Sequence, residues 1–231
     1  MKSRLFFSLA LCLAVGGCKN PAADVPAAET APAPSEGSAA AAPAEEAAAA
    51  PAEGSAAAPA AEAPASQPTG REIALHSENL KVGFVGSKVT GSHEGSFGTV
   101  AGRIVTGASI PESSVEVTIQ MASVTTDNDD LIAHLKSPDF FSVEQFPTST
   151  FASTSITANP DGTFTVVGTL DLRGIKKEIT FPATITMGET GVSMTAEFSI
   201  RRQDWEIVYP GRADDLIRDE VVLKIAITNA V

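Results

Sequence analysis

The amino-acid sequence predicts an all-β fold for residues 71–231, an antiparallel up-and-down β-barrel of about eight strands with one short helix. Three observations support this prediction. Apolar and polar residues alternate with a period of two along most of the region, which is typical of strands with one buried face. Gly- and Pro-containing turns separate the alternating stretches. Many sequential strands joined by tight turns favour a sheet that closes on itself, because closure removes exposed strand edges.

The strands follow from this alternation. The clearest apolar stripes begin at Val115, Phe164, Ile179, Val192 and Val221, and the opposite faces carry Thr, Ser, Glu and Lys. One face of each strand is therefore expected to be buried and the other exposed. We expect strands at residues 71–76 or 80–85, then 96–106, 114–121, 149–157, 163–171, 177–187, 191–201 and 219–229.

The one expected helix lies near residues 129–141 and is broken at Pro138. Acidic residues in its first turn suit the helix dipole, and Thr126 or Asp127 is a suitable N-cap. The run of acids at residues 127–130 does not continue as a calcium loop, because Ile132 stands where that loop requires Gly. We therefore assign this acidic run to the start of the helix.

The first 18 residues predict the signal peptide of a lipoprotein. Lys2 and Arg4 give a positive start, and the apolar run at residues 5–15 is too short to span a bilayer as a helix. Small residues precede Cys18, as in a lipobox, where the cysteine is acylated and becomes the first residue. The alternative is an ordinary secretory signal that contains a cysteine. Because Lys19 follows Cys18 in place of Asp, we expect an outer-membrane anchor that faces the periplasm.

Residues 19–70 predict a disordered Ala/Pro/Glu-rich tether. Proline interrupts the alanine runs, and the segment offers no large apolar side chain for tertiary contact. A flexible chain of about 50 residues has a mean span of roughly 40 Å. We therefore expect the tether to hold the barrel away from the membrane.

The net charge of −12 makes a nucleic-acid partner unfavourable, because phosphate binding requires a basic surface. Attraction to anionic lipid headgroups is disfavoured for the same reason. Membrane attachment is therefore expected through acyl chains on Cys18. The only other cysteine, Cys12, lies inside the signal, so the folded domain has no disulfide and no thiolate.

The polar residues give little basis for catalysis, a metal or a cofactor. His76, His93 and His134 have no second His or Cys at ligand spacing, and no Gly-rich phosphate loop follows a strand. Residues 91–95 lack the spacing of a nucleophile elbow. We expect no catalytic residue, although a cluster of His93, Glu94 and another ionisable group inside the barrel would favour an enzyme.

The most informative motif lies in residues 131–151. His134 and Leu135 are followed by a Ser-Pro break, the pair Phe140-Phe141 and a second break at Pro147. This motif resembles the signature of the YceI-like family, bacterial β-barrels that bind lipids or polyisoprenoids. The resemblance continues at residues 77–84, 97–102, 115–126, 168–177 and 200–205.

The sequence departs from the family pattern at three places. Lys88 stands near a common His, Leu131 and Ile132 replace an Arg-Asp pair, and Arg201 replaces an Asn. These substitutions concern polar positions, so they affect the expected contacts with the headgroup of a ligand. They do not change the prediction of a barrel.

The resemblance implies a lipocalin-like barrel with an elongated apolar cavity for a long-chain lipid or isoprenoid, and no catalytic residues. His134, Leu135, Phe140 and Phe141 would form a lid over one mouth. The expected lining is Phe84, Phe97, Ile119, Phe151, Phe164, Val166, Leu170, Phe181, Phe198 and Trp205.

Other interpretations stay open at this point. Periodicity alone does not distinguish a hollow barrel from a filled one. A filled barrel would serve as a protein-interaction or scaffold module, and an enzyme acting on lipid-like substrates is a further alternative. The sequence also leaves open whether the protein forms a homodimer.

Overall fold

The computed structural model describes residues 20–33, 70–188 and 191–231, so the predicted signal peptide and Cys18 lie outside the described residues. The helices are α1 (Asp129–Lys136) and the 3₁₀ turns η1 (Ile110–Glu112), η2 (Met121–Ser123) and η3 (Arg202–Trp205). The strands are β1 (Glu29–Pro32), β2 (Glu72–His76), β3 (Leu80–Ser87), β4 (Ser92–Phe97), β5 (Val100–Val105), β6 (Ser114–Gln120), β7 (Val124–Thr126), β8 (Thr148–Ala158), β9 (Phe164–Leu172), β10 (Ile175–Gly188), β11 (Gly191–Arg201), β12 (Gly211–Arg212), β13 (Asp215–Leu216) and β14 (Glu220–Ala230).

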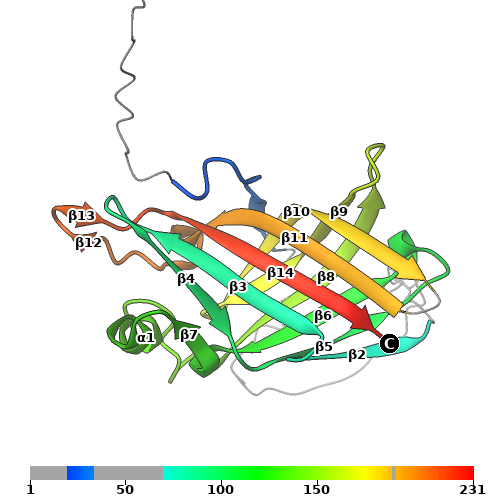
Figure 1. The fold of residues 1–231 in the computed structure, drawn as a ribbon, viewed down its shortest axis with the longest axis horizontal. Coiled ribbons are helices and arrows are strands. Elements are labelled where there is room, and N and C mark those ends of the chain that lie inside the picture. Colours follow the sequence, from blue (N-terminus) through cyan, green and yellow to red (C-terminus); the bar gives the residue numbers. More distant parts are fainter. Residues whose placement is uncertain (1–19, 34–69, 189–190) are drawn as a thin grey trace, which may run out of the picture.

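Eight long strands form the wall of the barrel (Figure 1). The first three are each interrupted once, as β2–β3, β4–β5 and β6–β7, and the others are β8, β9, β10, β11 and β14. Each strand pairs antiparallel with the next along the chain. The last strand, β14, pairs with β3 and so closes the ring. The predicted up-and-down barrel is confirmed, and both candidates for its first strand are parts of one interrupted strand.

The predicted helix begins and ends close to where the sequence placed it. Its N-cap is Asn128, whose Oδ1 accepts a hydrogen bond from the Leu131 amide at 3.0 Å, so the predicted cap at Thr126 or Asp127 is wrong. The helix ends at Lys136, just ahead of the residue that precedes Pro138, because a residue before proline disfavours the helical conformation. No helix in the described part of the chain is long and apolar enough to cross a membrane.

The aliphatic part of the main hydrophobic core lies at the end of the barrel near the C-terminus. It includes Ile73, Ile104, Ile156 and Val192, each at most 8% exposed. Helix α1 and the β12–β13 hairpin lie at the opposite end (Figure 1). The two ends therefore differ, since one is packed with aliphatic side chains and the other is covered by the helix and loops.

The structure differs from the predicted tether at residues 20–33, which lie on the outer face of the barrel (Figure 1). Val85 and Val222 point outward from adjacent strands and are only 5% and 1% exposed, because Ala22 and Val25 pack over them. Farther along, the Ser199 amide donates to the Pro26 carbonyl at 2.8 Å. The prediction of a disordered tether from residue 19 is therefore wrong for this segment, and residues 34–69 lie outside the described part.

An open seam in the barrel explains why this small-residue segment is ordered. Strands β10 and β11 pair only between residues 184–188 and 191–195. Beyond that point β1 lies in the seam, paired with β10 through residues 177–180. The residues just before β1 contact β11, where the Ala28 amide donates to the Ser199 carbonyl at 2.8 Å. Unpaired strand edges leave backbone groups without partners, and β1 together with the residues before it supplies those partners.

Candidate functional site

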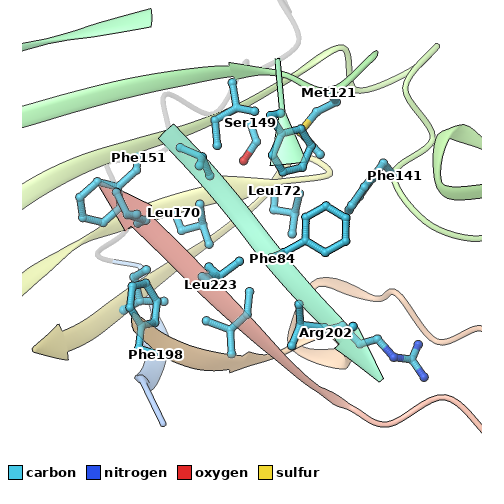
Figure 2. A pocket seen from close by; sticks show the side chains of 18 of the residues that line it. Phe84, Met121, Phe141, Ser149, Phe151, Leu170, Leu172, Phe198, Arg202 and Leu223 are labelled. Atoms are coloured by element: carbon cyan, nitrogen blue, oxygen red, sulfur yellow. The ribbon is translucent and has the colours of Figure 1, made fainter. Parts of the chain in front are cut away.

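An apolar cavity of about 180 Å³ lies inside the barrel and extends beneath the lid segment. All eight barrel strands contribute side chains to its wall, and nearly all of these side chains are apolar. Figure 2 shows Phe84 of β3, Leu170 and Leu172 of β9, and Leu223 of β14 around the cavity. Ligand sites in proteins are typically concave and mostly apolar, so this cavity is the candidate functional site.

The inward-facing side chains show that the barrel is hollow. Val117, Ile119, Leu172, Leu223 and Ile225 point into the barrel, yet all five are only half-buried. Their remaining accessible surface faces the cavity. A filled core would bury these side chains, so the interpretation as a solid scaffold barrel loses its main support. A separate cavity at the packed end has a volume of only about 30 Å³.

Seven of the ten residues predicted to line a ligand cavity do line this one. They are Phe84, Phe97, Ile119, Phe151, Leu170, Phe181 and Phe198. Two aromatic rings among them depend on facing glycines. A Cβ at Gly95 would lie 2.3 Å from the Phe84 ring, and a Cβ at Gly168 would lie 2.4 Å from the Phe151 ring. Glycine at these positions therefore lets the rings approach the neighbouring strand closely.

The other three predicted lining residues do not reach the cavity. Val166 is 1% exposed and packs in the core against its cross-strand neighbours Ile156 and Phe181. Phe164 packs half-buried against the same core. Trp205 is fully buried in η3, beyond the end of β11, where the strand alternation no longer applies. The alternation along β9 gave the direction in which Val166 and Phe164 point. It did not give their position along the barrel axis.

Three of the four residues of the predicted lid border the cavity. Leu135, Phe140 and Phe141 line the cavity, and the Phe141 ring lies 6.0 Å from the Phe97 ring. His134 does not line it. The His134 ring packs edge-on against Phe140 at 4.9 Å and Tyr209 at 4.7 Å. Its Nε2 lies 3.1 Å from Oδ2 of Asp139, so His134 ties the helix to the turn that follows.

Several lining residues were missed by the sequence analysis. Some of these, Ile179, Met194, Leu223, Ile225 and Ile227, already belong to the inward stripes, so a full reading of each stripe would have found them. Arg202 also continues the period of two after Phe198 and Ile200. Ser87, Ile207, Ile217 and Arg218 come from strand ends and loops, where the sequence carries no such signal.

Arg202 is a charged residue buried at the edge of the cavity (Figure 2). It is 5% exposed, and its guanidinium donates to backbone carbonyls of Ile207, Ile217 and Arg218. Burial lowers the pKa of Arg202 from its ordinary value, and nearby Asp219 opposes this change. Arginine stays protonated in proteins, so the side chain places a fixed positive charge beside an apolar space.

The β12–β13 hairpin is held beside the cavity by an ion pair. Nζ of Lys88 lies 2.5 Å from Oδ2 of Asp215, and the Thr90 hydroxyl donates to Oδ1 of Asp215 at 2.9 Å. The Lys88 ammonium lowers the pKa of Asp215. Lys88 thus fixes the loop that brings Ile217 and Arg218 to the cavity.

The ionisable residues considered for catalysis do not gather in the cavity. His93 Nδ1 lies 3.0 Å from Oδ1 of Asp127, and Glu94 pairs with Lys224 at 3.2 Å on exposed side chains. None of these four residues lines the cavity. Within residues 20–33, 70–188 and 191–231, no group of three His, Cys, Asp or Glu side chains could hold a metal ion.

Comparison with known proteins matches the domain to one family. The model of the YceI-like domain matches residues 74–229. A UPF0312 protein of Ectopseudomonas mendocina is 37% identical over 90 residues, which cover 38% of this chain and 47% of that protein. Another, from Yersinia enterocolitica, is 40% identical over 72 residues, or 31% of this chain and 37% of that protein. The chain therefore spans about half the length, or less, of these curated relatives.

Two solved structures described here share the fold. Burkholderia cenocepacia BcnA superimposes with a TM-score of 0.57 at 20% identity, covering 64% of this chain and 95% of that one. A polyisoprenoid binding domain from Saccharophagus degradans gives a TM-score of 0.55 at 17% identity, covering 67% and 95%. At these identities the likeness shows the fold alone.

Proposed function

Because this chain belongs to the YceI-like domain family, we propose that it is a non-catalytic binding protein that holds a long-chain lipid or polyisoprenoid in the barrel cavity. The observation that carries the proposal is the hollow apolar interior, which Phe140 and Phe141 border at one end. An apolar chain enclosed there would gain about 25 cal/mol per Å² of buried surface, before the costs of association. The fold shared with a polyisoprenoid binding domain is consistent with this ligand class.

Native mass spectrometry tests this proposal directly. The protein is purified as a form that begins at Lys19, which keeps every described residue. We expect an adduct with the mass of a long-chain lipid, or uptake of an added long-chain probe in a one-to-one ratio. A protein that carries no lipid and takes up no probe would contradict the proposed function.

We also propose that the barrel is anchored to the outer membrane, facing the periplasm, through acyl chains on Cys18. The docked segment begins at Asn20, and two extended residues reach at most about 7 Å. An acyl anchor at Cys18 would therefore hold the wall formed by β3, β14, β11 and β10 close to the bilayer. This arrangement replaces the long spacer that the sequence suggested, and it favours exchange of ligand with the adjacent membrane.

Metabolic labelling with a fatty-acid analogue tests the anchor. We expect the full chain to be labelled and to fractionate with membranes, because the acyl chains supply about 0.8 kcal/mol per buried methylene. Cys18→Ser should abolish both label and membrane association. Cys12→Ser, a change of the same kind inside the signal, is the matched control and should leave both unchanged. Equal labelling of the wild type and Cys18→Ser would refute the anchor.

A further inference from the structure

Residues 26–32, which we call the strap, fill a gap in the wall of the barrel (Figure 1). Within the described residues, β10 pairs with β9 through residues 175–183 but with β11 only through residues 184–188. Beyond that pairing the strap lies between the two strands, because β1 pairs with β10 and the Ala28 amide donates to the Ser199 carbonyl of β11 at 2.8 Å. The strap therefore takes the place of direct pairing between β10 and β11.

This gap adjoins the cavity. Continuing the register of the paired part places Phe181 opposite Phe198, and their rings stack with centroids 4.1 Å apart. The next inward pair is Ile179 and Ile200, where the strap already separates the strands, since Ile179 lies opposite Thr30 of β1. All four of these side chains of β10 and β11 line the cavity. Where it passes the two isoleucines, the strap is therefore part of the wall between the cavity and the outside.

Side chains hold the strap only weakly. Within it, Ala28 and Thr30 are half-buried and the other residues are exposed. Ala28 contributes a single methyl group to the main core. Burial stabilises in proportion to the apolar area removed from water, so the strap depends mainly on its backbone hydrogen bonds. Segments with so few buried apolar contacts open locally much more often than the whole fold unfolds.

The residues before the strap are held more firmly. Ala22 and Val25 pack over Val85 and Val222, and Val222 is only 1% exposed. These valines belong to β3 and β14, so this contact lies away from the gap between β10 and β11. The strap can therefore leave the gap while residues 20–25 stay docked on the barrel.

Departure of the strap would leave an opening wide enough for a lipid chain. Neighbouring strands lie about 4.8 Å apart, so a strand placed between two others holds them roughly 10 Å apart. An extended hydrocarbon chain is no wider than a strand. Ile179 and Ile200 would border the opening, and their side chains suit an apolar chain.

We propose that the strap is the gate of a lateral portal between β10 and β11, through which the chain of a lipid ligand enters and leaves the cavity. The portal lies in the wall that an acyl anchor on Cys18 would hold close to the bilayer, so a chain could pass sideways from the membrane into the barrel. This inference rests on the proposed function, because the portal serves a ligand that binds inside the barrel.

A disulfide that fastens the strap tests the gate. The protein that begins at Lys19 has no cysteine, so Ala31→Cys with Glu178→Cys allows a single bridge. The two residues lie opposite each other in the β1–β10 register, and opposite Cα atoms, about 4.5–5.5 Å apart, suit a disulfide. Uptake of cis-parinaric acid, a fluorescent fatty acid, is followed by stopped-flow mixing. We expect oxidation to slow uptake about tenfold and to leave the equilibrium affinity unchanged, because the bridge forbids the local opening on which entry depends. Reduction should restore the original rate.

The matched control is Thr184→Cys with Thr195→Cys, a bridge between β10 and β11 where the two strands already pair. Both threonines are exposed, and oxidation of this pair should leave the uptake rate unchanged. A second variant acts in the opposite direction. Deletion of β1, residues 29–32, should speed both uptake and release about tenfold. The deletion tests the portal even where the bridge to the strap does not form.

The outcomes separate this inference from the proposed function. Uptake at the unmodified rate by the oxidised strap variant would overturn the portal and leave binding in the cavity intact, because the chain would then enter elsewhere. Unchanged rates after deletion of β1 would overturn the portal as well, since the strap would then not limit entry. Failure of the unmodified protein to bind the probe at all would reject the proposed function and the portal with it.

Discussion

Leu223→Trp is expected to weaken binding of a long-chain probe about a hundredfold, because it fills the middle of the cavity. Leu223 lines the cavity and lies opposite Phe198 on one side and Phe84 on the other. An indole in place of the isobutyl group would exclude roughly three methylene groups of a bound chain, each worth about 0.8 kcal/mol when buried. That loss of about 2.4 kcal/mol corresponds to nearly two factors of ten in affinity.

The matched control is Lys224→Trp, which places the same ring on the outer face of the same strand. Lys224 is 44% exposed, and its ion pair with Glu94 contributes little to stability, as is usual for exposed pairs. Titration with a fluorescent fatty acid compares the two variants, and circular dichroism shows that both barrels are formed. Wild-type affinity in Leu223→Trp would mean that the chain does not bind in this cavity.

Deleting residues 20–33 is expected to lower the free energy of unfolding by about 2–3 kcal/mol, after the gains and losses are combined. The deletion re-exposes Val85 and Val222, at a cost of about 1.5 kcal/mol for each valine. It also removes the seam hydrogen bonds of Ser199, worth about 1 kcal/mol each. Release of the segment returns part of this cost as conformational entropy. Urea denaturation measures the difference.

A deletion of equal length and similar composition, residues 44–57, is the control for the N-terminal deletion. It should leave the urea midpoint unchanged. A point variant sharpens the comparison: Ala22→Glu places a carboxylate against Val85 and Val222, whereas Ala23→Glu changes an exposed neighbour. Equal midpoints for the two deletions would show that the segment does not stabilise the barrel.

Much of the barrel could be predicted because strand alternation is a local property of the chain. A period of two assigns each side chain to one face, and consecutive antiparallel strands place those faces together. The stripes therefore correctly placed residues such as Leu170, Phe181 and Phe198 inside the barrel. The break between the helix and β8 was predictable for a similar reason, since Pro138 and Pro147 interrupt regular structure there. The lid itself was expected only from the family resemblance.

The docked N-terminal segment could not be predicted from its own residues. Residues 20–33 consist mainly of alanine, proline and a few acids and have no amphipathic pattern, so their sequence predicts disorder. Its order depends on the unpaired edges of β10 and β11, and these edges face each other only once the barrel has formed.

The sequence by itself determined which side chains face inward, where the helix lies and that the strands follow one another around a barrel. The tertiary structure alone decided that the barrel is hollow, which residues border its cavity and which segment covers the seam. The physical reason is that alternation fixes the direction of a side chain relative to its own strand. The distance between opposite walls depends on how all eight strands pack together, and no single stretch of sequence encodes that distance.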